Sequence, residues 1–357
     1  MPIRSHAAAT ATDAALRRAL LRWYGRHRRP LPWRATRDPY RVWLSEVMLQ
    51  QTRIATVTPY YHAFLRRFPT LEALARARDA DVLEAWAGLG YYRRARSLHA
   101  AARWVVREHG GRVPDEPASF ARLPGVGRYT TGAVLSIAYG RPLPALDGNA
   151  ARVLSRLEAL PASVRVPAGA RRLWERAAAL VPARRPGDWN QALMELGATV
   201  CTPRAPGCAA CPLRRACRAH ALGCVDRFPP APARHAGERV RQAHALITRR
   251  GRVLMARREG PLLAGLWEPP GVEVRRGRPE TALRRRLAEL GLRVRLVPAN
   301  ASVRHTITHR RIEAEVWRGE LSGPTPRSAR LRWVAPREPG VALTALARKV
   351  AGMPRVH

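Results

Sequence analysis

Two carboxylates stand apart from the other acidic residues of this 357-residue chain. Glu46 lies in the apolar stretch 43–49, where burial would raise the pKa of its carboxyl group and suit it to general acid catalysis near neutral pH. Asp147 precedes a helix expected to begin near Ala150. Local sequence favours a helix N-cap role for it, and the alternative is an ionised carboxylate that stabilises a cationic sugar. One protonated and one ionised carboxyl group flanking a glycosidic bond are suited to cleaving that bond.

All five cysteines fall within residues 201–224. Four of them have the spacing C-x6-C-x2-C-x5-C and can surround one metal centre: Cys201, Cys208, Cys211 and Cys217. Structural zinc is the alternative, but zinc sites usually carry two short-spaced pairs and only one C-x2-C is present. The spacing favours a 4Fe–4S cluster in the loop 201–217, with Cys224 as a structural residue. A disulfide framework is disfavoured because no secretory signal is recognisable.

A glycine turn at residues 123–130 is a candidate phosphate contact. Gly125 and Gly127 allow a tight turn and a close approach to another surface. The helix expected to start within Arg128–Thr131 would add free N–H groups and the positive end of its dipole. No strand precedes the turn, so it is not a dinucleotide-binding fingerprint. Between two helices it fits a helix-hairpin-helix that grips the DNA backbone without reading sequence.

The charge balance points to a polyanionic partner. The chain has 64 Lys+Arg against 26 Asp+Glu, a net charge of +38, which fits nucleic acid or an anionic membrane surface. No apolar run approaches the roughly 20 residues needed to span a bilayer, and Met1–Leu16 lacks the apolar core of a secretory signal. We therefore expect a cytoplasmic, nucleoid-associated bacterial protein that does not bind a membrane.

Two domains are expected to position these residues. Residues 13–225 carry apolar residues at helical spacing and no competing strand pattern, so we predict an all-α domain with helices over Leu71–Trp86 and Arg93–Glu108. Asp38 and the proline after it should open a further helix.

A different pattern follows the helical part. The proline-rich stretch 226–240 predicts a linker, and residues 241–357 mix strand and helix patterns typical of a smaller α+β domain. The strands expected there are Ala243–Thr248, Arg252–Ala256, Arg311–Trp317 and Leu331–Val334, with a helix over Glu280–Leu290.

Taken together, these residues resemble the helix-hairpin-helix DNA glycosylase superfamily, and within it the MutY-type adenine DNA glycosylases. The stretches that carry the resemblance, which runs from about Arg22 to Val334, are Leu31-Pro-Trp-Arg34, 45–52, 88–92, 123–130, 146–149 and the four cysteines. It implies a glycosylase domain with a 4Fe–4S cluster and a Nudix-like second domain. It also implies a monomeric enzyme that hydrolyses the N-glycosidic bond of adenine opposite 8-oxoguanine or guanine in double-stranded DNA, after flipping the adenine out of the helix.

The resemblance also implies roles for single residues. Glu46 would protonate adenine N7 and Asp147 would stabilise the oxocarbenium ion, while Tyr129 and Asn149 would orient the carboxylates and the water. The residues it implies in contact with the base or the DNA are Arg34, Gln51, Leu89, Tyr91, Gly125, Gly127 and Gln191, with Gln51 and Tyr91 wedging into the duplex.

The lysine content bears on the type of reaction. Related glycosylases that also cut the backbone form a Schiff base through a lysine at the position of Tyr129. Here the only lysine is Lys349, in the other domain. Without a positioned amine there is no nucleophile for strand cleavage, so we predict a monofunctional enzyme that leaves an abasic site.

Residues 240–357 resemble the Nudix-like domain of this family, which helps to recognise 8-oxoguanine. Its local signature is Leu266–Gly271, with Pro269 where Phe is usual. Arg285 and Ala288 stand where a Nudix hydrolase has magnesium-binding glutamates, so the domain should recognise a base rather than hydrolyse a nucleotide.

The family's Phe-Ser-His recognition loop corresponds to Ile307-Thr308-His309. Isoleucine can still wedge and threonine keeps a hydroxyl donor, which makes Thr308 and His309 candidate recognition residues. Two other functions stay open on the sequence: a glycosylase of this scaffold for another base, such as thymine, and a non-catalytic protein that only binds lesions.

Overall fold

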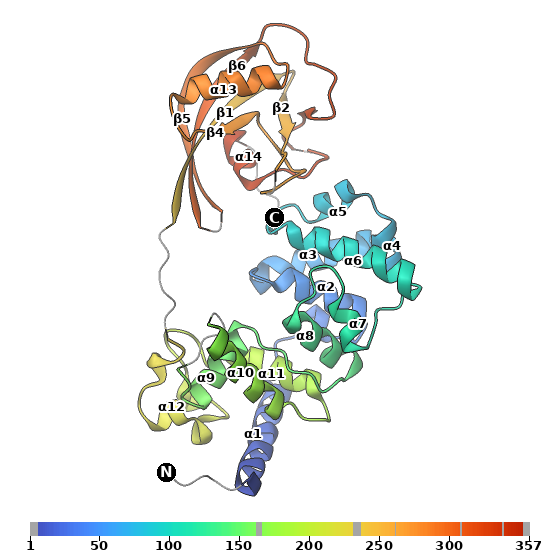
Figure 1. The fold of residues 1–357 in the computed structure, drawn as a ribbon, viewed down its shortest axis with the longest axis vertical. Helices are drawn as coiled ribbons and strands as arrows, with labels where there is room; N and C mark the ends of the chain where they lie inside the picture. Colours follow the sequence, from blue (N-terminus) through green and yellow to red (C-terminus); the bar gives the residue numbers. More distant parts are fainter. Residues whose placement is uncertain are drawn as a thin grey trace. The chain divides into compact units, whose positions relative to one another are not determined.

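The computed structural model describes residues 6–161, 166–230, 237–260, 262–307, 309–337 and 339–352. The chain divides into two compact units. The first consists of Met1–His62, Phe68–Ala75 and Ala100–Ala233, and the second of Ala63–Arg67, Arg76–His99 and Arg234–His357. Figure 1 shows helices from α1 to α12 and, in the orange and red part of the chain, a sheet with two helices. The expected order, an all-α part followed by a smaller α+β part, is confirmed.

Every regular element described before residue 238 is helical. The α-helices are α1 (His6–His27), α2 (Pro39–Leu49), α3 (Ile54–Arg67), α4 (Leu71–Arg76), α5 (Asp79–Ala85), α6 (Arg93–His109), α7 (Pro117–Ala121), α8 (Arg128–Tyr139), α9 (Gly148–Leu157), α10 (Pro167–Leu180), α11 (Pro186–Thr199) and α12 (Arg218–Ala221). The 3-10 turns are η1 (Pro32–Arg34), η2 (Cys208–Ala210), η3 (Arg214–Ala216) and η4 (Val225–Arg227). Among the described helices, none combines the length and the apolar character needed to cross a membrane.

Local sequence sets where the site-bearing helices begin. Asp38 caps α2 by accepting a hydrogen bond from the Arg41 N–H at 2.8 Å, and a proline occupies the first turn as predicted. Helix α8 begins directly after Gly127 and ends at Tyr139. The next residue, Gly140, has the left-handed φ of 68° typical of a glycine that terminates a helix.

One predicted helix is wrong in extent. Leu71–Trp86 was expected as a single helix, but the structure has α4 and α5 separated by an extended Arg78 (ψ 146°). The cause is local: Asp79 and Asp81 lie in the first turn of α5, where the helix dipole favours acids. The Arg78 guanidinium also pairs with Asp81 at 2.7 Å, which fixes the break.

One hydrophobic core of the first unit lies between α1, α9, α10 and α11. Its fully buried side chains include Leu20, Tyr24, Leu154, Leu173 and Trp189. Cys201, Cys211 and Cys217 pack against the same core, so the cysteine loop is anchored to helices that precede it in the chain.

The second unit carries a seven-stranded sheet. Its strands are β1 (Glu238–Arg249), β2 (Arg252–Arg257), β3 (Trp267–Glu268), β4 (Gly271–Glu273), β5 (Val294–Ile307), β6 (Arg310–Leu321) and β7 (Leu331–Val334). The order is β3-β2-β1-β6-β5, with β4 also paired to β1 and β7 to β2. The pair β1–β6 is parallel and the other pairs are antiparallel.

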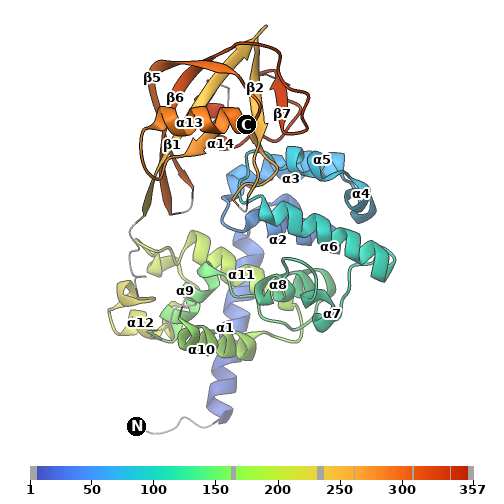
Figure 2. The same cartoon turned by 45° about the horizontal axis from the view of Figure 1, so that its top comes forward.

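Alternating side chains give this sheet two buried faces. On β1, Ala243 and Ala245 face α13 (Pro279–Glu289), whereas Val240 faces α14 (Ala345–Val350) together with Ile312 of β6. Figures 1 and 2 both show α13 running across the sheet. The predicted strands all lie within observed strands, and the predicted helix coincides with α13 except for Leu290, which follows the last helical residue. Strands β3, β4 and β5 were not predicted from the sequence.

Candidate active site

Glu46 is buried on α2, with 5% of its surface exposed. The Tyr129 hydroxyl, from the first turn of α8, donates to Glu46 Oε2 at 2.6 Å and lies 3.3 Å from the sulfur of Met194 on α11. Burial raises the pKa of Glu46 to about 7, although the Tyr129 hydrogen bond and the Arg34 charge act in the opposite direction. This carboxyl group can therefore hold a proton near neutral pH, as the sequence predicted.

The structure confirms that Asp147 is the N-cap of α9, and it gives the second oxygen of the carboxylate a donor as well. Its Oδ1 accepts the Ala150 N–H at 2.7 Å, which caps α9, and its Oδ2 accepts the Asn149 side-chain amide at 2.9 Å. Burial raises the pKa of Asp147, while these donors and the nearby Arg152 oppose the rise. Donors directed at both oxygens favour the ionised form of a carboxylate.

The two carboxyl groups lie within electrostatic reach of each other. The negative charge of Asp147 contributes to the raised pKa of Glu46. The pKa of the Tyr129 hydroxyl also shows that both carboxyl groups are near. Burial raises this pKa well above its usual value, and the charges of Glu46 and Asp147 both raise it further. The structure thus brings together three of the residues singled out from the sequence, from α2, α8 and the start of α9.

Two glycines permit the close packing that holds Asp147 there. A Cβ on Gly132 of α8 would lie 1.8 Å from the Pro144 carbonyl oxygen, in the segment leading to Asp147. A Cβ on Gly197 of α11 would lie 2.7 Å from the Cβ of Asn149. A larger residue at either position would push the Asp147 segment away from α8 or α11.

Arg34 belongs to an ion-pair network that sequence analysis missed. Its Nη2 donates to Glu195 Oε2 at 2.8 Å, and Arg29 adds bonds of 2.7 Å to each oxygen of the same carboxylate. Glu195 is 1% exposed. Burial alone would raise its pKa, but the hydrogen bonds from Arg29 and Arg34 lower it to about 2. Glu195 directly follows Met194, so the network fixes the part of α11 that contacts Tyr129.

Arg152 is a second missed residue, and it links Asn149 to the cysteine loop. Its Nη2 donates to Asn149 Oδ1 at 2.9 Å and to the Gly197 carbonyl at 2.8 Å, and its Nε donates to the Cys201 carbonyl at 2.8 Å. Asn149 is therefore held on one side by Asp147 and on the other by Arg152. Its residue type gave no signal, because arginine is the commonest basic residue of the chain.

Cys201, Cys208, Cys211 and Cys217 line one cavity, and Cys224 is not among its lining residues. Arg156 is 2% exposed and connects the cysteine loop to the segment after it. It donates to the Thr202 carbonyl at 2.7 Å and to the Phe228 carbonyl at 2.8 Å. Within the described residues, no three His, Cys, Asp or Glu side chains converge closely enough to hold a single metal ion. The four thiols around this cavity are the candidate metal ligands.

The glycine turn forms the predicted helical hairpin between α7 and α8. The Val126 N–H donates to the Leu123 carbonyl at 3.0 Å, and Gly125 adopts a left-handed φ of 77°, which glycine allows without strain. Gly125 and Gly127 are both exposed, so their backbone can approach another molecule closely.

The remaining candidates lie at different places. Gln51 follows α2, is exposed, and has a left-handed φ of 58°. Gln191 lies on α11 three residues before Met194, so both occupy one helix face.

The other candidates belong to the second unit. Leu89 is buried there, Tyr91 is 41% exposed with a left-handed φ of 49°, and His309 is exposed. Thr308 lies outside the described residues.

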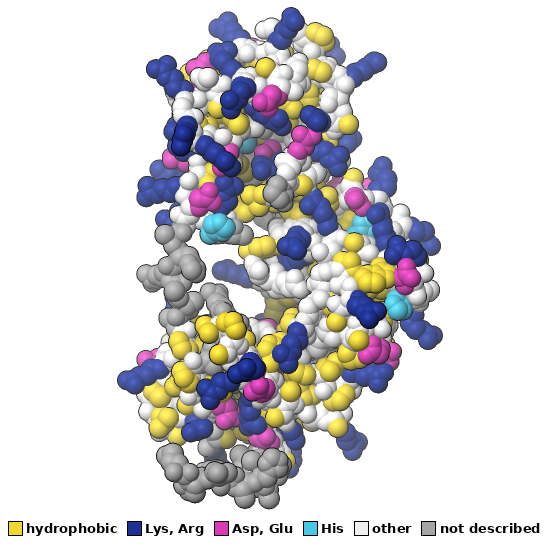
Figure 3. All heavy atoms as spheres, in the orientation of Figure 1, with side chains coloured by type: hydrophobic (Ala, Val, Ile, Leu, Met, Phe, Trp, Pro, Cys, Tyr) yellow, Lys and Arg dark blue, Asp and Glu magenta, His cyan; other side chains and the backbone are white. Residues whose placement is uncertain are grey.

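Basic side chains cover much of the described surface. Figure 3 shows Lys and Arg side chains, in dark blue, spread over the face in view and over both units. With a net charge of +38, this surface fits a polyanionic ligand.

Two protein-family descriptions match the chain. The HhH-GPD superfamily of base excision DNA repair proteins matches residues 44–178, and the NUDIX domain matches residues 243–352. The first match contains Glu46, Tyr129, Asp147 and the glycine turn, and the second contains the sheet.

Comparison with single proteins gives the same result as the two family matches. The human adenine DNA glycosylase is 37% identical over 405 residues, which covers 95% of this chain and 73% of that protein. A thermostable thymine-DNA glycosylase of known structure gives a TM-score of 0.55 at 31% identity, covering 60% of this chain and 99% of that one. A trapped endonuclease III–DNA covalent intermediate gives 0.50 at 21% identity, covering 59% and 98%, which supports the fold.

The fold and the site thus define a helix-hairpin-helix scaffold of base excision DNA repair followed by a Nudix-like domain. The 37% sequence identity to the human adenine DNA glycosylase covers 95% of this chain, and it identifies a particular family within that class. The chain belongs to the adenine DNA glycosylase family, as its motifs had indicated.

Proposed function

We propose that this protein is a monofunctional DNA glycosylase that removes adenine mispaired with 8-oxoguanine or guanine. The observation that carries the proposal is that Glu46, whose pKa is raised to about 7, lies within electrostatic reach of Asp147. Two hydrogen-bond donors hold the Asp147 carboxylate. Adenine is released poorly as an anion and well when protonated, so its excision needs a proton donor facing a stabiliser of positive charge.

The proposed reaction begins with the adenine flipped out of the duplex. Glu46 transfers its proton to adenine N7, and the C1′–N9 bond breaks with its electron pair moving to the base. The positive charge left on the sugar is stabilised by Asp147. Water then adds to C1′ and loses a proton to the ionised Glu46, which restores the enzyme and leaves an abasic site.

Tyr129 supports this division of roles. Its hydroxyl donates a hydrogen bond to Oε2 of Glu46. Oε1 is therefore the oxygen that would carry the proton and deliver it to the base. Asn149 orients Asp147 in the same way through Oδ2. Because Tyr129 stands where strand-cleaving relatives have lysine, no amine is available at this point to attack the sugar, and the enzyme is expected to release the base without cutting the strand.

We further propose that Cys201, Cys208, Cys211 and Cys217 hold a 4Fe–4S cluster. Their spacing, with a single C-x2-C pair, favours a cluster over one zinc ion, and all four line one cavity. Bound there, the cluster would supply a rigid crosslink between the ends of the loop, next to Arg152 and Arg156.

The proposed ligand is double-stranded DNA, bound by a monomer at the nucleoid. The exposed hairpin glycines and the N-terminus of α8 suit a phosphate contact, and the left-handed, exposed Gln51 and Tyr91 suit residues that enter the duplex. His309 of the Nudix-like domain would contact 8-oxoguanine opposite the adenine. Arg34 and Gln191 would contact the flipped base.

The test is excision from a panel of duplexes under single-turnover conditions, with adenine opposite 8-oxoguanine, adenine opposite guanine, and thymine opposite guanine. We expect adenine release from the first two and none of the thymine. The thymine arm is needed because a thymine-DNA glycosylase shares the fold. Release of thymine but not adenine would overturn the proposal.

A further inference from the structure

The turn that carries His309 is very short. Strand β5 ends at Ile307 and β6 begins at Arg310, and these two residues pair directly in the antiparallel register. Ile307 and Arg310 are three positions apart in the chain, so His309 lies directly beside the paired ends of the two strands. The position of His309 depends on how firmly the end of this hairpin is held.

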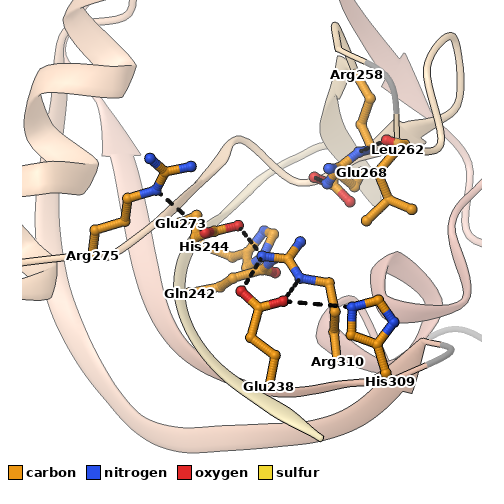
Figure 4. Close-up of polar contacts among 10 residues, drawn as sticks. All are labelled: Glu238, Gln242, His244, Arg258, Leu262, Glu268, Glu273, Arg275, His309 and Arg310. Atoms are coloured by element: carbon orange, nitrogen blue, oxygen red, sulfur yellow. Dashed lines mark hydrogen bonds and ion pairs between the residues drawn. The ribbon is translucent and has the colours of Figure 1, made fainter.

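Arg310 ties the hairpin to two other strands. Its Nη2 donates to Glu273 Oε2 at 2.7 Å, and its Nε donates to Glu238 Oε2 at 3.0 Å. Glu238 is the first residue of β1 and pairs with Arg310 in the parallel register, whereas Glu273 is the last residue of β4. Figure 4 shows the guanidinium between the two carboxylates, so one side chain joins β1, β4 and β6 at the start of β6.

The ion-pair cluster of Arg310, Glu238 and Glu273 also contacts His309. Its Nε2 lies 3.9 Å from Glu238 Oε2, as the dashed line in Figure 4 marks. The backbone is close too: a Cβ on Gly237 would lie 2.9 Å from the His309 carbonyl oxygen. Both the side chain and the backbone of His309 thus lie against the start of β1.

The strength of the cluster comes from its geometry. Arg310 is only 18% exposed, and it makes charge-assisted hydrogen bonds to two acids at once. These bonds raise the pKa of Arg310 and lower that of Glu273. By contrast, Arg241 on the same sheet makes one 3.4 Å contact with Glu315, and both of those side chains are more exposed.

We propose that Arg310, braced by Glu238 and Glu273, is a positioning residue for His309 and thereby sets how strongly the enzyme prefers 8-oxoguanine over guanine opposite adenine. The inference rests on the proposed function, in which His309 contacts the opposite base. Arg310 acts on this preference through the turn, without contact with the reacting adenine.

The test compares Arg310→Gln with the matched control Arg241→Gln, which removes the same charge from the same sheet. Single-turnover adenine excision is measured opposite 8-oxoguanine and opposite guanine. We expect Arg310→Gln to lower the ratio of the two rates about fivefold, equivalent to about 1 kcal/mol. Arg241→Gln should leave the ratio within about twofold, because a single exposed ion pair contributes little.

A second variant separates positioning from general destabilisation. In a His309→Ala background the ratio should be lower already, and Arg310→Gln should change it no further. If Arg310→Gln does not fold, Glu273→Gln replaces it, since it removes one of the two ion pairs and leaves the other. The expected loss is then smaller but in the same direction.

The failures are distinguishable. A wild-type enzyme without any preference for 8-oxoguanine would refute both the proposed role of His309 and this inference. A wild-type preference that Arg310→Gln leaves unchanged, or that falls equally in the His309→Ala background, would overturn the inference alone.

Discussion

The two buried glutamates of the first unit should respond to neutralisation in opposite directions. Burial raises the pKa of Glu46 from 4.5 to about 7, whereas hydrogen bonds from Arg29 and Arg34 outweigh burial at Glu195 and lower its pKa from 4.5 to about 2. Replacing each glutamate by glutamine removes its titration and keeps its size. The pair of variants is therefore a matched test of the site's electrostatics.

The sign follows from proton binding. Between pH 4.5 and 7 the folded protein holds the Glu46 proton and the unfolded chain does not, so the free energy of unfolding falls as pH rises through this window. The difference between a pKa of 4.5 and one of about 7 corresponds to about 3 kcal/mol. Glu46→Gln should match the wild type near pH 4.5 and be more stable by up to about 3 kcal/mol at pH 8.

Glu195 gives the opposite expectation. Its lowered pKa contributes stability that is fully present above pH 4.5 and is lost as pH falls towards 2. Glu195→Gln should therefore be less stable than the wild type by about 3 kcal/mol at pH 8, since two arginines lose their buried partner.

Urea unfolding followed by far-ultraviolet circular dichroism at pH 4.5, 6 and 8 measures both effects. The reasoning would be refuted if Glu46→Gln were no more stable than the wild type at pH 8, or if the two variants shifted stability in the same direction.

Three further outcomes are expected. The single-turnover excision rate should fall about tenfold per pH unit above about pH 7, because only protonated Glu46 donates a proton, and Glu46→Gln should abolish this limb of the pH profile. Borohydride should trap no enzyme–DNA adduct, because Tyr129 offers no amine; a trapped adduct would contradict the monofunctional mechanism. Cys208→Ser should abolish the visible absorbance of an iron–sulfur protein, whereas Cys224→Ser should keep it, and equal spectra would remove the proposed ligand assignment.

The sequence indicated the candidate acid–base residues of the site, but not the ion pairs that hold them in place. Glu46 was recognisable because an acid in an apolar helix is unusual. Glu195 carries the same signal, but its partners Arg29 and Arg34 lie more than 160 positions away, so local sequence could not reveal them. Asp147 was treated as either an N-cap or a functional carboxylate, because sequence does not show that capping uses only one of its oxygens and that Asn149 donates to the other.

The fold was predictable where patterns were strong and local. Strand β6 buries alternate residues and was predicted within its bounds. Strand β5 has only one fully buried residue, and a register shift between Pro298 and Ala301 interrupts its alternation. Strand β3 has two residues and β4 three, too few for any pattern, and they form only because longer strands lie beside them. The break between α4 and α5 was missed because the apolar spacing continues across it.

The central claim, that an ionised Asp147 and a protonated Glu46 act together on one adenine nucleotide, is tested most directly by Asp147→Asn. Asparagine is also a good N-cap, so α9 should keep its start and the protein its fold, which thermal unfolding checks. With adenine opposite 8-oxoguanine, we expect single-turnover base release to fall at least about a hundredfold relative to the wild type. Base release at the wild-type rate by the folded variant would contradict the account.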